Sequence, residues 1–190
     1  MATAGENRVL QIWDTATGAS VGQPVPHEYQ ITAVAFGPDG QRVVTANEGS
    51  VRVWDTESGS AVTPPMQHDD RVMHVVFSAD GTRVLTASTD RTARVWNAAS
   101  GQPVTEPLEH GGVVRYAEFS PNGQQVVTAS EDRTARLWSL SPGSVDAAGW
   151  RRRAQLLAAR RIDETGAAVT IDTSQFLDLW KEANHKLGVR

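Results

Sequence analysis

The sequence contains no cysteine. This absence excludes a disulfide framework and a thiolate metal site. The chain also has no apolar run of about 18 residues, so we expect no membrane-spanning segment. The opening residues, MATAGENRVLQIW, lack a basic stretch followed by an apolar one. We therefore expect no secretory signal peptide and a cytoplasmic location.

Basic residues are scarce in most of the chain. Residues 1–140 carry 10 basic residues against 16 acidic ones, so we expect this part to repel nucleic acid. Residues 141–190 carry 8 basic and 6 acidic residues. Apolar residues make up 39% of the sequence, and 16 glycines and 9 prolines are spread along it. This composition is typical of a folded protein rich in turns, with room for one domain or one domain plus an appendage.

A repeat of 41 or 42 residues runs through the first 140 residues. Three independent markers share this period: tryptophans, histidines and turn tripeptides. They are Trp13, Trp54, Trp96 and Trp138; His27, His68 and His110; and PDG, ADG and PNG at residues 38–40, 79–81 and 121–123. Such a period is the signature of a repeat architecture.

Each period contains short runs rich in valine and threonine, separated by Asp-Gly, Thr-Asp-Arg and Ser-Gly turn signals. One period therefore predicts four strands, and its neighbours repeat them one period away. The four strands are expected over residues 71–77, 83–87, 92–96 and 102–106. The chain then holds two complete units, over residues 31–64 and 71–106. A unit before them lacks its first strand, and a unit after His110 shows no clear fourth strand.

A period near 42 with four strands, a His before the first, an Asp before the third and a Trp at its end resembles the WD-repeat β-propeller family. The resemblance covers residues 1–140 and includes the dipeptide WD at Trp13-Asp14 and Trp54-Asp55. It implies an all-β fold, a partial propeller of about four blades with four antiparallel strands each. It also implies a non-catalytic scaffold for protein-protein interaction.

The number of blades in the sequence is small for this family, whose propellers close with about seven. An open arc of blades exposes faces that need a neighbour. The resemblance therefore predicts that the chain is the C-terminal part of a longer propeller whose remaining blades cover these faces, or that the chain self-associates.

In this family a His, a Ser or Thr, an Asp and the Trp form a buried, hydrogen-bonded tetrad. A buried indole N–H needs an acceptor, a hydroxyl both donates and accepts, and an imidazole links the hydroxyl to a carboxylate. By position, the resemblance assigns two complete tetrads. They are His68, Thr86, Asp90 and Trp96, and His110, Thr128, Asp132 and Trp138.

Two other copies depart from this pattern. His27, Thr45 and Trp54 form a third set in the segment TANEGSVRVW, whose turn is one residue shorter and offers only Asn47 or Glu48 where Asp is expected. The first copy has Asn7 at the Asp position and no upstream His.

Two patterns in the sequence match catalytic motifs. The Thr-His-Asp set resembles a nucleophilic triad, but it recurs every 42 residues, whereas a catalytic constellation is assembled once. The segment GASVG at residues 18–22 matches G-x-S-x-G, which would expose Ser20 as a nucleophile before a helix. The aligned segments ESGSAVT and ASGQPVT predict a turn between strands instead. A hydrolase using Ser20 is thus the least favoured function, and we expect no enzyme, metal or cofactor.

The family resemblance places a partner surface on the narrow face of the propeller, where loops enter the first strand and turns join the second and third strands. The chain residues at these places are Tyr29, Gln30, Asp69, Asp70, Arg71, Met73, Arg115, Glu131 and Arg133. We expect a protein or peptide partner. Arg91 and Arg133 are expected in exposed turns, and Arg94 and Arg136 within strands, with their stems along a blade face.

The period stops after the linker SLSPGS, so residues 141–190 form a linker and a helical C-terminal tail. A helix is predicted over residues 146–161, with acidic and basic residues at its two ends. A second helix is predicted from Asp172, an N-cap, to the stop at Gly188. Between them AAVTID, residues 167–172, is compatible with a strand that completes the last blade.

The end of the chain carries a second resemblance. The segment RRIDETG and a late Leu-Trp before a basic finish are similar to the tails of bacterial multidomain proteins in which a serine/threonine kinase precedes WD repeats. This resemblance implies a rival function, the C-terminal regulatory part of a kinase whose catalytic domain lies upstream.

Overall fold

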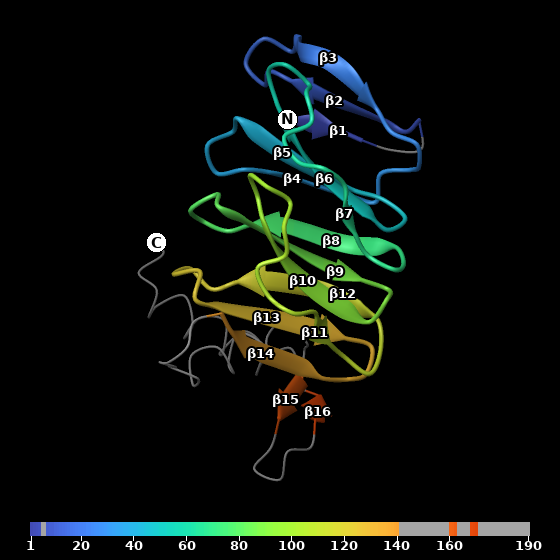
Figure 1. The fold of residues 1–190 in the computed structure, drawn as a ribbon, viewed down its shortest axis with the longest axis vertical. Coiled ribbons are helices and arrows are strands. Elements are labelled where there is room, and N and C mark those ends of the chain that lie inside the picture. The colour runs from blue at the N-terminus through green and yellow to red at the C-terminus, as the bar shows by residue number, and fades with distance from the viewer. Residues whose placement is uncertain (5–6, 141–159, 163–167, 171–190) are drawn as a thin grey trace.

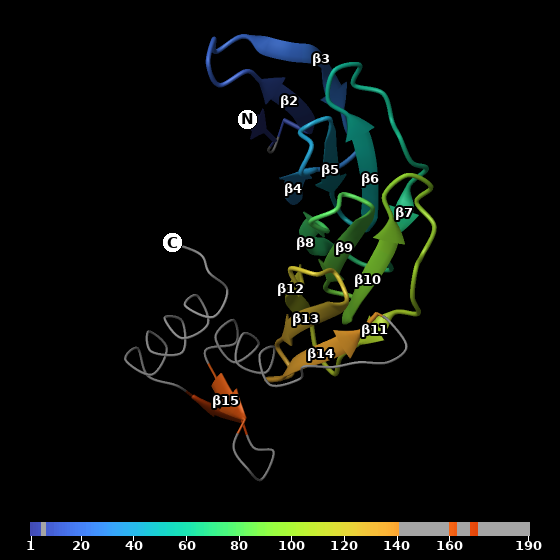
Figure 2. The same cartoon turned by 90° about the vertical axis from the view of Figure 1, so that its left-hand side faces the viewer.

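The computed structural model describes residues 1–4, 7–140, 160–162 and 168–170, and within them the chain forms strands and turns without a helix (Figure 1). The predicted all-β fold is confirmed for this part of the chain. Four antiparallel sheets follow one another in sequence order, and Figure 2 shows them along a curved path. This arc is consistent with part of a propeller.

The first sheet and the fourth sheet have three strands each within the described residues. The first sheet consists of β1 (Ala2–Thr3), β2 (Val9–Trp13) and β3 (Ser20–Pro26). The fourth sheet consists of β12 (Val114–Phe119), β13 (Gln125–Ser130) and β14 (Ala135–Ser139). In this part of the chain, the first sheet therefore lacks a strand before β1, and the last has none after β14.

The second and third sheets have four strands each. The second sheet consists of β4 (Ala33–Phe36), β5 (Arg42–Ala46), β6 (Ser50–Asp55) and β7 (Met66–Gln67). The third consists of β8 (Val72–Phe77), β9 (Arg83–Ser88), β10 (Thr92–Asn97) and β11 (Leu108–Glu109). In both sheets the spatial order of the strands equals their order in the chain.

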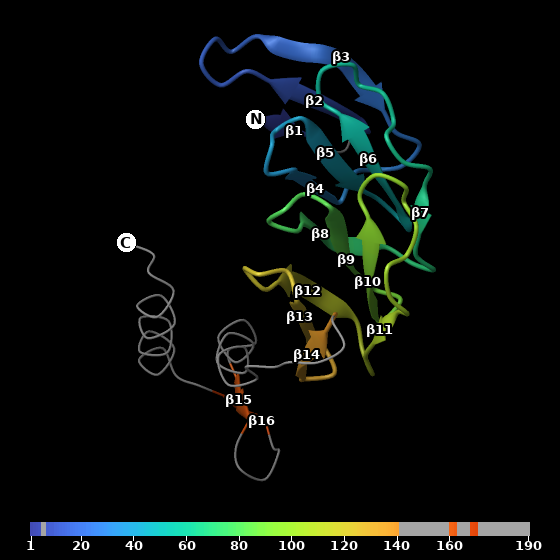
Figure 3. The ribbon, with the colours of Figure 1, turned by 60° about the vertical axis from the view of Figure 1, so that its left-hand side comes forward.

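The strands of one sheet line up with those of the next. The innermost strands β4, β8 and β12 pack on one another, and Figure 3 shows them along one side of the arc. The outermost strands β3, β7 and β11 lie along the other side. Side chains from both faces of the middle strands are fully buried between sheets, as with Val43 and Val44 of β5 and Val84 and Leu85 of β9. Each sheet therefore depends on its neighbours for its core.

The fourth strand of the repeat differs from the prediction. The sequence predicts it over residues 102–106, but the fourth strand of the third sheet is β11, a few residues later. The segment before β11 makes one isolated bridge, between Pro103 and Trp96. Proline has no N–H to donate, so Pro103 and Pro107 interrupt pairing to β10 until the chain has passed both.

The tail also differs from its prediction where the structure describes it. Arg160 and Arg161, expected at the end of a helix, lie in β15 (Arg160–Ile162). This strand pairs antiparallel with β16 (Ala168–Thr170). The strand in AAVTID is therefore present, but it pairs with β15 and does not complete the fourth sheet. The other residues of the two predicted helices lie outside the described residues.

The innermost strand of the second sheet leaves apolar side chains exposed. Val34 and Phe36 are both 37% exposed, whereas their counterparts Val75 and Phe77 in β8 are 4% and 7% exposed. The preceding sheet covers Phe77, because Arg42 lies over its ring at 5.8 Å. The first sheet begins at the short β1, and among the described residues no arginine lies over the Phe36 ring as Arg42 lies over that of Phe77.

Candidate functional site

The four side chains expected around His68 lie together between β7 and the third sheet. The His68 Nδ1 atom is 2.7 Å from Asp90 Oδ2, and Nε2 is 2.7 Å from the Thr86 hydroxyl oxygen. The same hydroxyl accepts a hydrogen bond of 3.0 Å from Trp96 Nε1. Thr92 donates its N–H and its hydroxyl to Asp90 Oδ1 at 2.8 and 2.7 Å. We call His68, Thr86, Asp90 and Trp96 the His68 tetrad.

The His110 tetrad, made of His110, Thr128, Asp132 and Trp138, repeats this geometry in the fourth sheet. The His110 Nδ1 atom is 3.0 Å from Asp132 Oδ2, and Nε2 is 2.6 Å from Thr128 Oγ1. Trp138 Nε1 donates to Thr128 Oγ1 at 2.9 Å. Because a carboxylate faces Nδ1 of each histidine, we assign the ring proton to Nδ1. The other ring nitrogen, Nε2, then accepts a hydrogen bond from the threonine.

The electrostatics of the two tetrads favour a charged aspartate. Burial alone would raise the pKa of Asp90 and Asp132, but hydrogen bonds outweigh it and hold both pKa values well below the ordinary 3.8. For Asp90 the strongest of these come from His68 and Thr92. Burial lowers the pKa of His110 below its ordinary 6.5, although Asp132 acts in the opposite direction.

Each tetrad joins two neighbouring sheets. The histidines follow the outermost strand of one sheet, while the Thr, Asp and Trp belong to the next sheet. The main chain of each histidine is held by the earlier sheet: His68 N donates to Gly49 O at 2.7 Å, and His110 N donates to Arg91 O at 2.9 Å. The histidine therefore fixes the spacing of two sheets, a role that its place in the repeat did not reveal.

The same turn position has a positive φ angle in each of the four sheets, and in the first three its carbonyl oxygen accepts the histidine N–H. Arg8, Arg91 and Arg133 have positive φ angles of 58°, 70° and 68°, and Gly49 has 137°. Positive φ is uncommon for residues other than glycine, so the turns before the third strands hold these arginines in a sparsely populated conformation. Arg91 and Arg133 are exposed, as the sequence predicts.

The His27 set differs from the tetrads in one respect. The His27 Nε2 atom is 2.9 Å from the Thr45 hydroxyl, which accepts 2.8 Å from Trp54 Nε1. The Nδ1 atom lies 3.0 Å from the carbonyl oxygen of Val25, so the partner of Nδ1 is a backbone carbonyl and not a carboxylate. Burial lowers the pKa of His27, and the charge of Arg52 lowers it further.

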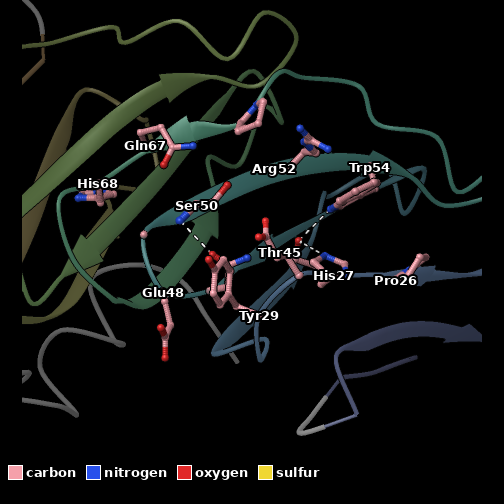
Figure 4. Close-up of a pocket in the computed structure, with 14 residues that line it drawn as sticks. Pro26, His27, Tyr29, Thr45, Glu48, Ser50, Arg52, Trp54, Gln67 and His68 are labelled. Atoms are coloured by element: carbon pink, nitrogen blue, oxygen red, sulfur yellow. Dashed lines mark hydrogen bonds between the residues drawn. The ribbon is translucent and has the colours of Figure 1, made fainter.

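An open cleft of about 460 Å³ lies beside the His27 set (Figure 4). We call it the His27 cleft. Its lining includes the rings of Tyr29 and Trp54, the side chains of Ser50 and Arg52, and Glu48 of the shortened turn. The sequence shows that this turn lacks an aspartate, but it does not show that a cleft lies beside the turn.

The first sheet retains two members of the pattern. Trp13 Nε1 donates to Thr3 Oγ1 at 2.8 Å. Asn7 Oδ1 accepts the N–H of Val9 at 3.3 Å, so this amide caps the turn in the way the aspartates do elsewhere.

The catalytic patterns are not supported by their surroundings. The tetrad threonines Thr86 and Thr128 are fully buried, so no substrate reaches their hydroxyl groups. Ser20 is exposed in β3, and the chain around it forms a turn and a strand with no helix following. In the described part of the chain, no group of three or more His, Asp or Glu residues is placed to hold a metal ion. No helix in this part is long and apolar enough to cross a membrane.

Seven of the nine residues of the predicted partner surface lie on loops and turns beside the tetrads, and Met73 and Arg115 lie at the starts of β8 and β12. Eight of the nine are exposed, and Met73 is partly exposed: the exposed ones are Tyr29, Gln30, Asp69, Asp70, Arg71, Arg115, Glu131 and Arg133. Arg115 Nε donates to Glu131 Oε1 at 2.8 Å, joining a first strand to a turn of the same sheet.

The tetrad aspartates also anchor these loops. Asp90 Oδ2 accepts the N–H of Asp69 at 3.2 Å, and Asp132 Oδ2 accepts the N–H of Gly111 at 2.9 Å. Thr89 N donates to Arg71 O at 2.9 Å. The loops that enter the innermost strands are therefore bonded to the tetrads below them.

The family model described as WD domain, G-beta repeat matches the chain three times, over residues 19–55, 62–97 and 101–139. No curated protein matches the chain. Each matched segment begins before one histidine of the period and ends just past the next tryptophan, so it contains the part of the chain that joins two sheets. The segments cover more than half of the residues and agree with the repeated sheets and tetrads. The chain therefore belongs to the WD40-repeat family.

Proposed function

We propose that the chain is a non-catalytic scaffold that binds a protein or peptide through the loops and turns on its tetrad side. WD40 repeats generally mediate protein interactions, which supports the proposal. The observation that carries it is the bonding of the loops: Asp90 and Asp132 hold the N–H groups of Asp69 and Gly111. Loops fixed in this way present charged side chains without a large entropic cost on binding.

Site-specific cross-linking tests this proposal. A photoreactive phenylalanine analogue replaces Met73 on the predicted surface or, as a control, Val62, which is 38% exposed in the segment between β6 and β7. We expect a protein from the source cells to cross-link through position 73 and not through position 62. Cross-linking through position 62 alone would contradict the assignment of the surface.

The charges of the surface give a second test. A variant with Arg71→Ala and Arg115→Ala removes two exposed guanidinium groups without touching a tetrad. We expect this variant to keep its melting temperature and to lose the cross-link at position 73. A lower melting temperature together with loss of the cross-link would show that the double substitution acts through folding.

The proposed absence of catalysis is tested with a simple ester. We expect no turnover of p-nitrophenyl acetate above that of free histidine. If the chain turns over the ester and Ser20→Ala abolishes this activity, the proposed absence of catalysis is wrong. The kinase relationship, the bacterial origin and the cytoplasmic location stay predictions.

A further inference from the structure

Three arginines occupy equivalent positions, two residues before the tryptophan in successive sheets. Arg94 donates to Gln67 O at 3.1 Å, and its Nη2 lies 3.8 Å from Asp90 Oδ2. Arg136 donates to Glu109 O at 2.8 Å and lies 3.8 Å from Asp132 Oδ2. In both cases the tetrad carboxylate provides a negative charge close to the guanidinium group.

Arg52 is the third of these arginines, and its surroundings differ. Its side chain makes no hydrogen bond or ion pair with any residue that the structure describes, and its guanidinium group lies over the Trp54 ring at 5.3 Å. The side chain is partly buried. A partly buried guanidinium group with five N–H donors and no acceptor is a site of attraction for an anion.

The missing carboxylate follows from the shortened turn. Thr45 and Trp54 are nine residues apart, whereas Thr86 and Trp96 are ten apart. Asn47 Oδ1 accepts the Ser50 N–H at 3.0 Å, as Asp90 Oδ1 accepts that of Thr92. Asn47 therefore closes the turn, but it brings no charge. Glu48, the only acid in this turn, is exposed, and Figure 4 shows its side chain pointing away from Arg52.

Ser50 and Arg52 line the His27 cleft, and their counterparts Thr92 and Arg94 contact the Asp90 carboxylate in the His68 tetrad. Ser50, the counterpart of Thr92, has no hydrogen-bond partner for its hydroxyl among the described residues. Tyr29, which is 47% exposed, forms another part of the wall. The cleft thus offers a guanidinium group and a hydroxyl beside aromatic surface, which is suited to an acidic side chain and its aliphatic stem.

We propose that the His27 cleft binds the carboxylate of a partner polypeptide, which pairs with Arg52 at the position that Asp90 and Asp132 fill in the complete tetrads. This inference rests on the proposed scaffold function and names the chemistry of one contact. Glu28 and Glu48 also line the cleft and oppose an anion at its mouth. The carboxylate therefore has to enter as far as Arg52, where the charge-assisted hydrogen bonds outweigh this repulsion.

A titration with short peptides tests the proposal. The isotope-labelled chain is titrated with acetyl-Gly-Glu-Gly-amide, and its NMR signals for Arg52 Nε–H, Ser50 and Tyr29 are followed. We expect saturable shifts that acetyl-Gly-Gln-Gly-amide does not produce. Acetyl-Gly-Gly-Gly with a free carboxyl terminus carries a terminal carboxylate in place of the side-chain carboxylate of Glu. The peptide of the two that binds more tightly shows which kind of carboxylate the cleft accepts. Equal shifts with the Gln peptide would overturn the proposal.

Two matched variants locate the binding. Arg52→Met keeps the length of the stem and removes the donors, so we expect affinity for the preferred acidic peptide to fall by about tenfold or more. Arg94→Met makes the same change one repeat later, where the guanidinium group already has partners. We expect it to leave peptide affinity unchanged, with melting curves to show that both variants are folded. Undiminished binding by folded Arg52→Met would overturn the assignment.

Glu48 supplies the remaining test, because it is the acid of the shortened turn and would compete for Arg52 if its side chain turned inward. If Glu48 is only a repulsive charge at the mouth, Glu48→Gln tightens peptide binding and leaves the melting temperature unchanged. A lower melting temperature would show that Glu48 itself pairs with Arg52 and would overturn the proposal, as would tighter binding of inorganic phosphate than of either acidic peptide. Failure of the acidic peptides with a retained cross-link at position 73 would reject this inference alone and leave the scaffold function in place.

Discussion

A single carboxylate in each complete tetrad accepts hydrogen bonds from three residues. In the His110 tetrad, Asp132 Oδ2 faces His110 Nδ1 and Gly111 N, while Oδ1 accepts from the N–H and hydroxyl of Thr134 at 2.8 and 2.6 Å. These bonds link the loop before β12, the turn after β13 and the start of β14. The aspartate is thus the residue whose loss leaves most donors without an acceptor.

Asp132→Ala is expected to lower the free energy of unfolding by about 1 to 3 kcal/mol, because buried donors lose their partner. Urea unfolding measures the change. Arg133→Ala is the neighbouring control: the side chain is exposed, and alanine meets the same positive φ, so we expect little effect on folding. An unchanged unfolding midpoint for Asp132→Ala would contradict the role of the tetrad.

The buried histidines predict a dependence of stability on pH. Burial lowers the pKa of His27, His74 and His110 below the ordinary 6.5, so below about pH 6.5 the unfolded chain binds more protons than the folded chain. The contribution of these neutral histidines to the free energy of unfolding is complete above that pH. It is lost as the pH falls through the pKa values that the histidines have in the folded chain. The tetrad aspartates have lowered pKa values, so their contribution persists above about pH 4 and is lost in stronger acid.

His74 offers a direct check of this dependence. Its Nδ1 atom is buried without a hydrogen-bond partner in the described structure, and its ring lies 4.2 Å from that of Tyr116. His74→Phe keeps an aromatic ring and removes the titrating group. We expect melting temperatures that fall less between about pH 7 and about pH 5 than those of the parent chain. An identical slope for the two chains would count against the assignment.

The tetrad residues could be predicted from sequence because their spacing repeats, whereas the altered members could not. A shortened turn shows that an aspartate is missing at Glu48, but not that the partner of the histidine Nδ1 is Val25 O or that Arg52 is left without a carboxylate. These facts depend on the path of the main chain around the turn. The left-handed arginines were also hidden, since Arg91 and Arg133 occupy turns where glycine or asparagine is the usual signal.

At the scale of the element, the contact between the first and second sheets includes a glycine. Gly22 lies in the irregular part of β3, where the register to β2 shifts between Leu10 and Ile12. Its φ is +66°, and a side chain there would place Cβ 2.8 Å from the carbonyl oxygen of Glu57, in the turn after β6. Gly22 therefore permits both the bulge and the close approach of two sheets.

Gly22→Ala and Gly18→Ala separate these two effects. Gly18 has a φ of +71°, but no atom lies within 4 Å of the place that a Cβ would take, so alanine there adds backbone strain alone, about 1 kcal/mol. Gly22→Ala adds a clash with backbone and is expected to cost about 2 to 3 kcal/mol. Chemical denaturation of the two variants measures the difference. An equal decrease in the free energy of unfolding for the two variants would show that the contact between the sheets adjusts to the extra methyl group without further destabilisation.

The elements were predictable where turn signals and alternation agree. The strands over 71–77, 83–87 and 92–96 correspond to β8, β9 and β10, because Asp-Gly and Thr-Asp-Arg turns delimit them. The fourth strand was misplaced because Ser-Gly marks a turn but not where pairing resumes, and prolines delay it. In the tail, the helix pattern over Arg160 and Arg161 was overridden by pairing with β16, a contact that composition does not encode.

At the scale of the whole molecule, the arc has an open end beside β1. Val34 and Phe36 are exposed there, and among the described residues β1 is paired along one edge only, with β2. An apolar patch next to a free strand edge favours association with another chain. We expect light scattering to show a molecular mass that rises with concentration. A monodisperse monomer with a cooperative melting transition would contradict this expectation.

The double variant Val34→Thr, Phe36→Thr tests whether this end carries the association. We expect it to shift the chain toward the monomer, because threonine keeps the strand propensity and lowers the apolar area. Val62→Thr with Val104→Thr is the matched control, since both valines are exposed away from β4, at 38% and 47%. If the control variant weakens association and the Val34→Thr, Phe36→Thr variant does not, the contact between chains lies elsewhere.

The histidine link between sheets bears on how such a chain can change length. Each histidine is bonded through its main chain to one sheet and through its ring to the next. Each matched family segment likewise begins before a histidine and ends just past the tryptophan of the next sheet. The sequence unit that repeats is therefore offset by about one strand from the sheet that folds. An in-frame loss of one whole period leaves each remaining histidine followed, at the usual spacing, by a threonine and a tryptophan of the next sheet. Repeat number can drift without breaking the joints.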